Sequence, residues 1–101
     1  MARILVAGTI RVPPENLQGL LRHAAPYIEA CRAEDGCEVF SFANDVIEPG
    51  LIRIFEVWRD DAALERHKSA PHVQTWRAAW PEHGVHGRSL TRYEAASAQP
   101  F

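Results

Sequence analysis

The sequence is poor in cysteine, with only Cys31 and Cys37 among its 101 residues and no Cys-x-x-Cys motif. Two thiols at this spacing provide no framework for a structural zinc ion. The spacing alone would permit a disulfide, but we expect reduced thiols because nothing in the chain indicates export to an oxidising compartment. The sequence is therefore not that of a disulfide-rich secreted scaffold.

An excess of positive charge is also missing. The chain has 11 lysine and arginine residues against 13 aspartate and glutamate residues, a formal net charge of −2. Proteins that bind nucleic acid or anionic membranes concentrate positive charge, so we expect neither partner. No apolar run approaches the roughly 20 residues of a membrane-spanning helix, and residues 1–12 lack the cleavage site of a signal peptide. We therefore expect a cytoplasmic protein.

The motifs of common cofactor sites are absent as well. The sequence contains no Gly-x-Gly-x-x-Gly, phosphate-binding loop, Gly-x-Ser-x-Gly or haem-attachment motif. No two histidines lie at metal-ligand spacing with a carboxylate on one helix face. We therefore expect no cofactor and no metal.

What is present is an alternation of strand-like and helix-like segments. Residues rich in β-branched and aromatic types predict strands at 4–12, 37–43, 51–58 and 85–95. Apolar residues at helical spacing predict helices at 14–34, 61–68 and 71–80. The order β-α-β-β-α-β predicts an α+β fold of the ferredoxin-like, split βαβ type, with an antiparallel sheet and both helical crossovers on one face. We assign residues 1–95 to this domain and 96–101 to a tail.

Three residues bear on where these helices begin and end. Asp60 and Ser69 are the expected N-caps of the segments at 61–68 and 71–80. Pro26 cannot donate to the carbonyl of Arg22, so we expect it to kink or break the first helix.

The predicted strands are apolar on both faces. In the third strand, Ile52 and Ile54 point to one side and Phe55 and Val57 to the other. Helices can cover one face only, and at about 25 cal/mol per Å² exposure of the other would forgo several kcal/mol. We therefore expect a homodimer in which a second copy covers that face. The alternative is that edge strands and the tail fold over it.

Two polar residues interrupt the apolar pattern. Glu56 lies in phase with the inward face of the third strand, and His67 lies on the inward stripe of the next helix. Because a buried carboxylate needs a partner, we predict a hydrogen bond or ion pair between them. The pair either only fixes the helix on the sheet or makes one member a base, since burial and pairing move either pKa toward neutrality.

A cleft between helices and sheet would be lined by aromatic side chains. Most of these side chains belong to the core, but such a cleft would suit a flat aromatic ligand. The predicted substrate-binding residues are Trp58, Phe40, His72 and Trp76.

Four stretches resemble the antibiotic biosynthesis monooxygenase (ABM) family, which includes quinol monooxygenases: Arg32–Cys37, Phe55–Asp60, Ala63–His67 and Ser69–Val73. The most specific piece is Glu-x-Trp followed by a helix that carries Ala-Leu-x-x-His. The resemblance implies a dimeric α/β barrel of two ferredoxin-like protomers. It also implies oxidation of phenols or hydroquinones by dioxygen without a cofactor, in the cleft between sheet and helices.

The positions that match the family's site are Glu56, Trp58, His67 and His72. On this resemblance His67, tuned by Glu56, is the catalytic base or the group that holds the phenolate, and Trp58 and Phe40 form walls of the pocket. Two other hypotheses remain open: a non-catalytic ligand-binding or stress-related dimer, and an isomerase or lyase that uses the same base without oxygen uptake.

Overall fold

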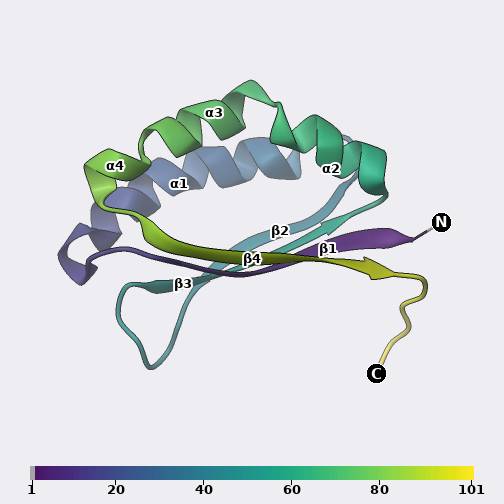
Figure 1. Ribbon diagram of the computed structural model, residues 1–101, viewed down its shortest axis with the longest axis horizontal. Helices are drawn as coiled ribbons and strands as arrows, with labels where there is room; N and C mark the ends of the chain where they lie inside the picture. Colours follow the sequence, from purple (N-terminus) through teal and green to yellow (C-terminus); the bar gives the residue numbers. More distant parts are fainter. Residues whose placement is uncertain (1) are drawn as a thin grey trace.

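The computed structural model describes residues 2–101 and has the predicted order of elements. Figure 1 shows the helices in one layer and the strands in another. The elements in chain order are β1 (Arg3–Arg11), a 3-10 turn η1 (Pro14–Asn16), α1 (Leu17–Arg32), β2 (Cys37–Asn44), β3 (Leu51–Trp58), α2 (Asp61–Lys68), α3 (Pro71–Ala78), α4 (Trp80–His83) and β4 (His86–Ala95).

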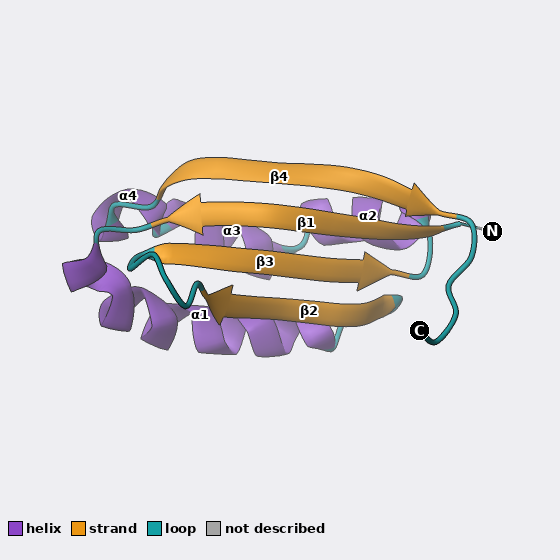
Figure 2. Cartoon of the chain, turned by 90° about the horizontal axis from the view of Figure 1, so that it is seen from below, coloured by secondary structure: helices purple, strands orange, loops and turns teal. Residues whose placement is uncertain are grey.

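The four strands form one antiparallel sheet in the order β2-β3-β1-β4. Figure 2, seen from the side opposite the helices, shows all four strands uncovered. The α+β ferredoxin-like fold predicted from the sequence is therefore confirmed. Residues after Ala95 form no helix or strand and lie beyond the end of the sheet.

The helix ends show which capping predictions hold. Asp60 caps α2, because its Oδ1 accepts a hydrogen bond of 2.9 Å from the Ala63 amide. The prediction for Ser69 is wrong: Ala70 is the N-cap of α3, and the Ser69 hydroxyl donates to the Arg66 carbonyl at 3.3 Å. Helix α3 has no side-chain cap. Pro71 is well suited to its first position, because an N–H there would have no partner within the helix.

The break that Pro26 could have caused does not occur, because α1 continues from Leu17 to Arg32. Pro26 and Arg22 are both exposed. The carbonyl of Arg22, which loses its helical partner, therefore lies on the side of the helix that meets water. None of the helices in residues 2–101 is both long and apolar enough to span a membrane.

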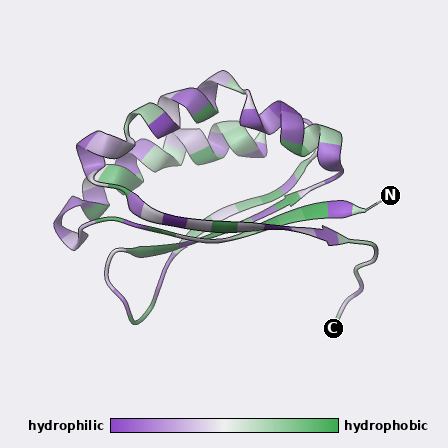
Figure 3. Ribbon diagram, in the orientation of Figure 1, coloured by the Kyte–Doolittle hydropathy of each residue, from purple (hydrophilic) through white to green (hydrophobic). Residues whose placement is uncertain are grey.

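The core lies between the helices and the sheet. One cluster packs Trp58 and Phe40 with Cys31 and Leu64, and a second packs Ile52 and other residues against α1 and α3. Figure 3 shows hydrophobic residues along β1 and hydrophilic residues over much of α2. Helix α1 buries three of its 16 residues, whereas β3 buries five of its 8, so this central strand supplies much of the core.

The opposite face of the sheet is also apolar but is not covered. One row crosses all four strands, because Val39 pairs with Val57, Val57 with Leu5, and Leu5 with Tyr93. Val39 and Tyr93 are 40% and 52% exposed, and Phe55, beside this row, is 42% exposed. We call this surface, Val39, Val57, Leu5, Tyr93 and Phe55, the open face.

Candidate functional site

A cavity of about 510 Å³ lies between the helices and the sheet. This volume falls in the range of small-molecule sites. Its apolar lining comes from all four α-helices and all four strands: Val6, Tyr27, Phe40, Phe42, Ile54, Leu64, Val73, Trp76, Trp80 and Leu90. The polar side chains Glu56 and His67 also line it.

Glu56 projects from β3 into this cavity and is almost entirely buried. The indole Nε1–H of Trp58 donates to Glu56 Oε1 at 2.9 Å. Burial raises the pKa of the Glu56 carboxyl, and the hydrogen bond from Trp58 opposes this shift in part. A buried carboxyl with a raised pKa is suited to accept and return protons.

The predicted pair between Glu56 and His67 is wrong. Side chains two residues apart on a strand share a face, so Trp58 is positioned to satisfy Glu56 from the same strand. His67 instead bonds a different carboxylate, that of Glu34. Its charge reaches Glu56 only as a smaller influence that lowers the Glu56 pKa.

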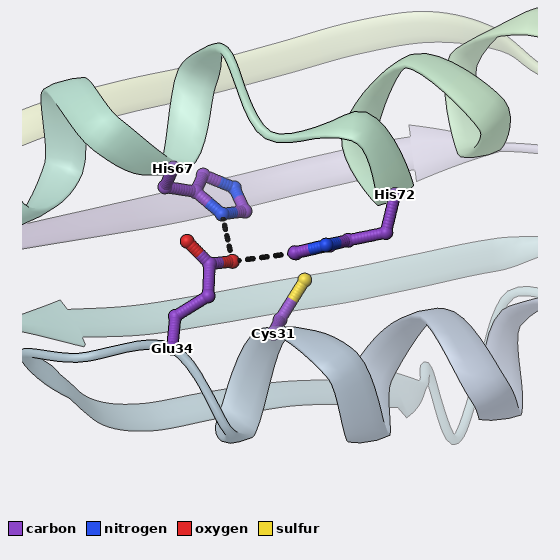
Figure 4. Close-up of side chains that lie close together, drawn as sticks. All are labelled: Cys31, Glu34, His67 and His72. Atoms are coloured by element: carbon purple, nitrogen blue, oxygen red, sulfur yellow. Dashed lines mark hydrogen bonds and ion pairs between the residues drawn. The ribbon is translucent and has the colours of Figure 1, made fainter.

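Glu34 joins two histidines from different helices (Figure 4). Its Oε2 lies 2.7 Å from His67 Nδ1 and 2.7 Å from His72 Nε2. His67 is in the last turn of α2, and His72 is in the first turn of α3. One carboxylate therefore connects α1, through the turn that follows it, to both α2 and α3.

This arrangement assigns the tautomer of His67. An ionised carboxylate only accepts hydrogen bonds, so His67 donates from Nδ1, and in the neutral ring Nε2 then carries the free lone pair. A ring orientation fixed by a carboxylate is a recurrent way to prepare histidine for proton transfer. The ring also packs on Trp58, with ring centroids 4.6 Å apart.

The turn at residues 33–36 holds Glu34 in place. The Glu34 amide donates to the Cys31 carbonyl, and the Cys37 amide donates to the Glu34 carbonyl, both at 3.1 Å. Gly36 adopts φ +87°, and a Cβ there would lie 2.5 Å from the Cβ of Ala63 in α2. The turn therefore packs directly against α2, which also carries His67.

Sequence reasoning missed Glu34 because its partners are 33 and 38 residues away. The available signal was its place in the stretch Arg32–Cys37, one of the four that resemble the ABM family. Tyr27 was also missed. It lies in helical phase with Leu20 and Ala24 and stacks on Trp76, with centroids 4.8 Å apart and planes 9° apart.

Of the other predicted site residues, two line the cavity and two lie behind its wall. Phe40 and Trp76 line the cavity, together with Glu56 and His67. Trp58 and His72 lie outside the lining: Trp58 is fully buried behind His67 and Glu56, and His72 bonds Glu34. These two support lining residues instead of forming the wall themselves.

A group of possible metal ligands exists here, although the spacing along the sequence gave no sign of it. The ligand atoms of Cys31, Glu34, His67 and His72 all lie within 4.8 Å of one another. In kind, these donors suit a transition metal such as zinc. However, both imidazoles already engage Glu34, and burial raises the pKa of the Cys31 thiol. A metal would therefore have to displace two hydrogen bonds and a thiol proton.

Comparison with known proteins supports the same fold. A crystal structure described as a "putative antibiotic biosynthesis monooxygenase" from Deinococcus radiodurans superposes with a TM-score of 0.84 at 30% identity and covers 97% of each chain. Protein sll1783 of Synechocystis is 32% identical over 96 residues, and the match covers 95% of this chain but 65% of that protein. The chain thus spans about two thirds of that relative's length.

A second sequence relative, "Putative monooxygenase YcnE" of Bacillus subtilis, is 29% identical over 79 residues, which are 78% of this chain and 83% of that protein. The sequence profile of the antibiotic biosynthesis monooxygenase family matches residues 3–79. This range includes β1 to β3, Glu34, Glu56 and the helices that carry His67 and His72. The chain is a member of the antibiotic biosynthesis monooxygenase (ABM) family.

Proposed function

We propose that the protein oxidises a small hydroquinone or polycyclic phenol with dioxygen and uses no bound cofactor. The observation that carries this proposal is the position of His67, which lines an aromatic cavity with its Nδ1 held by Glu34. The family membership and the monooxygenase descriptions of its relatives point to the same reaction class.

The reaction needs little from the protein beyond proton transfer and positioning. His67 Nε2 takes the phenolic proton, and the phenolate, which is electron-rich, can itself reduce dioxygen. For a hydroquinone, one oxygen atom enters the ring and the other leaves as water, so hydroquinone plus O2 gives hydroxyquinone plus H2O. The substrate supplies all four electrons. Glu56, which lines the same cavity and has a raised pKa, is the second proton-transferring group.

The aromatic walls orient the substrate and exclude water. Phe40, Tyr27 and Trp76 all line the cavity, and Tyr27 packs on each of the other two rings. Exclusion of water strengthens the electrostatic interactions of His67 and Glu56 with a phenolate and protects a reactive intermediate.

The open face supports a second part of the proposal, that the protein is a homodimer. Its apolar row crosses all four strands, and neither the helices nor residues 96–101 lie over it. A second copy placed face to face would cover the same surface on both partners. The two cavities would then lie on the outer sides of the paired sheets.

Oxygen consumption with a panel of hydroquinones, in metal-free buffer, tests the reaction. We expect a rate above uncatalysed autoxidation for the wild type and a loss of about 100-fold or more in His67→Ala. His86→Ala is the matched control, because His86 is exposed and lies outside the cavity lining. Binding of the phenol without oxygen uptake would instead identify a ligand-binding protein, and product formation without oxygen uptake would identify an isomerase or lyase.

A further inference from the structure

The cavity wall is rich in positive charge, although the chain as a whole is slightly acidic. Glu56 is the only carboxylate among its lining residues, which include four basic side chains: Lys68, Arg77, Arg88 and Arg92. Over the full sequence, acids outnumber lysine and arginine by 13 to 11. Glu56 is the one acidic group that opposes this charge, and the charge of Arg88 lowers its pKa.

Two of the four basic side chains already have acidic partners. Lys68 Nζ lies 3.0 Å from Glu65, and Arg92 pairs with Asp61 and, at 3.2 Å, with Glu94.

Arg77 and Arg88 are different. Within residues 2–101, neither forms an ion pair with a carboxylate. Neither guanidinium is therefore held by a carboxylate of the described chain.

These two arginines come to the cavity from different elements. Arg77 is in the last turn of α3, and Arg88 is the third residue of β4. The Arg77 Cζ lies 4.8 Å from the centroid of the Trp80 ring, a cation–π contact that orients the guanidinium. Burial lowers the pKa of Arg77, and the charge of Arg88 lowers it further. Both side chains are exposed and line the same cavity, and two like charges at one cavity favour an anion between them.

The remaining lining is complementary to a ring. Tyr27 and Trp76 form a stacked pair, and Phe42 lies at a centroid distance of 5.8 Å from Trp76. A flat ring against these side chains would place an anionic substituent near the guanidinium groups. Guanidinium forks bind carboxylates through paired, charge-assisted hydrogen bonds.

We propose that Arg77 and Arg88 form an anion-binding subsite, and that the cavity takes a phenol or hydroquinone that carries a carboxylate. The phenolic part of this ligand rests on the proposed function. The carboxylate part rests only on the two unpaired arginines at the cavity wall.

Quenching of tryptophan fluorescence measures binding independently of turnover, since Trp76 and Trp80 line the cavity. The probes are 2,5-dihydroxybenzoate and the neutral hydroquinone with the same ring substitution. We expect the wild type to bind the carboxylate about tenfold tighter or more, the order expected for charge-assisted hydrogen bonds. The double variant Arg77→Gln/Arg88→Gln should lose this preference.

The matched control is Arg92→Gln, which removes a charge from the same cavity but from an already paired side chain. It should keep most of the preference. Circular dichroism establishes that each variant is folded, and the wild type alone gives a second test, because added salt should reduce its preference. Equal affinity for the two probes in the wild type, or an equal loss in the Arg92 variant, would overturn the subsite.

Oxygen uptake separates the two proposals. A preference for the carboxylate that depends on Arg77 and Arg88, without oxygen uptake, would support the subsite and overturn the reaction. Oxygen uptake that His67→Ala abolishes, with no preference between the probes, would support the reaction and overturn the subsite.

Discussion

Both faces of the sheet carry apolar side chains, but the helices cover only one of them. On the covered face, Ile52, Ile54 and Trp58 are buried, and Glu56 is buried with them. On the open face, Phe55 is 42% exposed and Val57 is partly exposed. Strand β3 thus contributes side chains to both faces, because successive residues point to opposite sides of the sheet. The difference teaches that the helices decide which face becomes a core and a cavity, while the other remains available for a partner.

A charge on the open face should have the largest effect, on the state of association. Val57→Asp places a carboxylate in the middle of the apolar row, so the proposed homodimer should dissociate to monomers at micromolar concentration. Light scattering coupled to size-exclusion chromatography measures this mass. The control is Val46→Asp, in the loop before β3, where the side chain is already 96% exposed. A wild-type protein that is itself monomeric would contradict the dimer.

A cavity on the covered face should have the next largest effect, on stability. Ile52 is 1% exposed, and Ile52→Ala should lower the free energy of unfolding by about 2–5 kcal/mol. The comparison is Val57→Ala on the opposite face, measured by urea denaturation at a concentration where the protein is monomeric. If both variants lose the same free energy, the two faces are equally buried within one chain and the comparison fails.

Loss of the charge on Glu34 should have a smaller effect on stability but a clear effect on activity. In Glu34→Gln the amide oxygen is a weaker acceptor for His67 and His72, and the expected loss is about 1–3 kcal/mol. Turnover should fall while the carboxylate probe still binds, because Arg77 and Arg88 are unchanged. Unaltered turnover in the folded variant would show that Glu34 only joins the helices.

Glu56→Gln should give the smallest change in stability, and in the opposite direction. The glutamine oxygen can still accept from Trp58, but no charge is buried, so unfolding at neutral pH should cost on the order of 1 kcal/mol more. Because the folded-state pKa of Glu56 is raised, the folded wild type takes up a proton before the unfolded chain does as pH falls. The advantage of the variant should therefore shrink toward acidic pH.

Denaturation curves at several pH values measure this trend. The proposed proton-transfer role requires the same variant to lose oxygen uptake. An advantage that grows as pH falls would mean that the Glu56 pKa is not raised.

The fold could be predicted from the sequence because its signals are local. Alternation along β3 and helical spacing in α1 each appear within one segment. Asp60 likewise caps the helix that directly follows it, by accepting from the amide of Ala63 three residues on. The polar contacts could not be predicted in the same way. His67 lay on the inward stripe as expected, but its choice of Glu34 over Glu56 depends on how the turn after α1 packs against α2. The unpaired state of Arg77 likewise depends on which acids the fold brings near it.

The contact between Gly36 and Ala63 has a consequence for how this protein can vary in evolution. A residue other than glycine at position 36 would have to adopt a left-handed backbone conformation, and its Cβ would clash with the methyl group of Ala63. Relief by glycine at position 63 would cost α2 about 1 kcal/mol of helix propensity. Among natural variants, glycine at 36 should therefore persist wherever 63 is alanine or larger, and the two positions should change together or not at all.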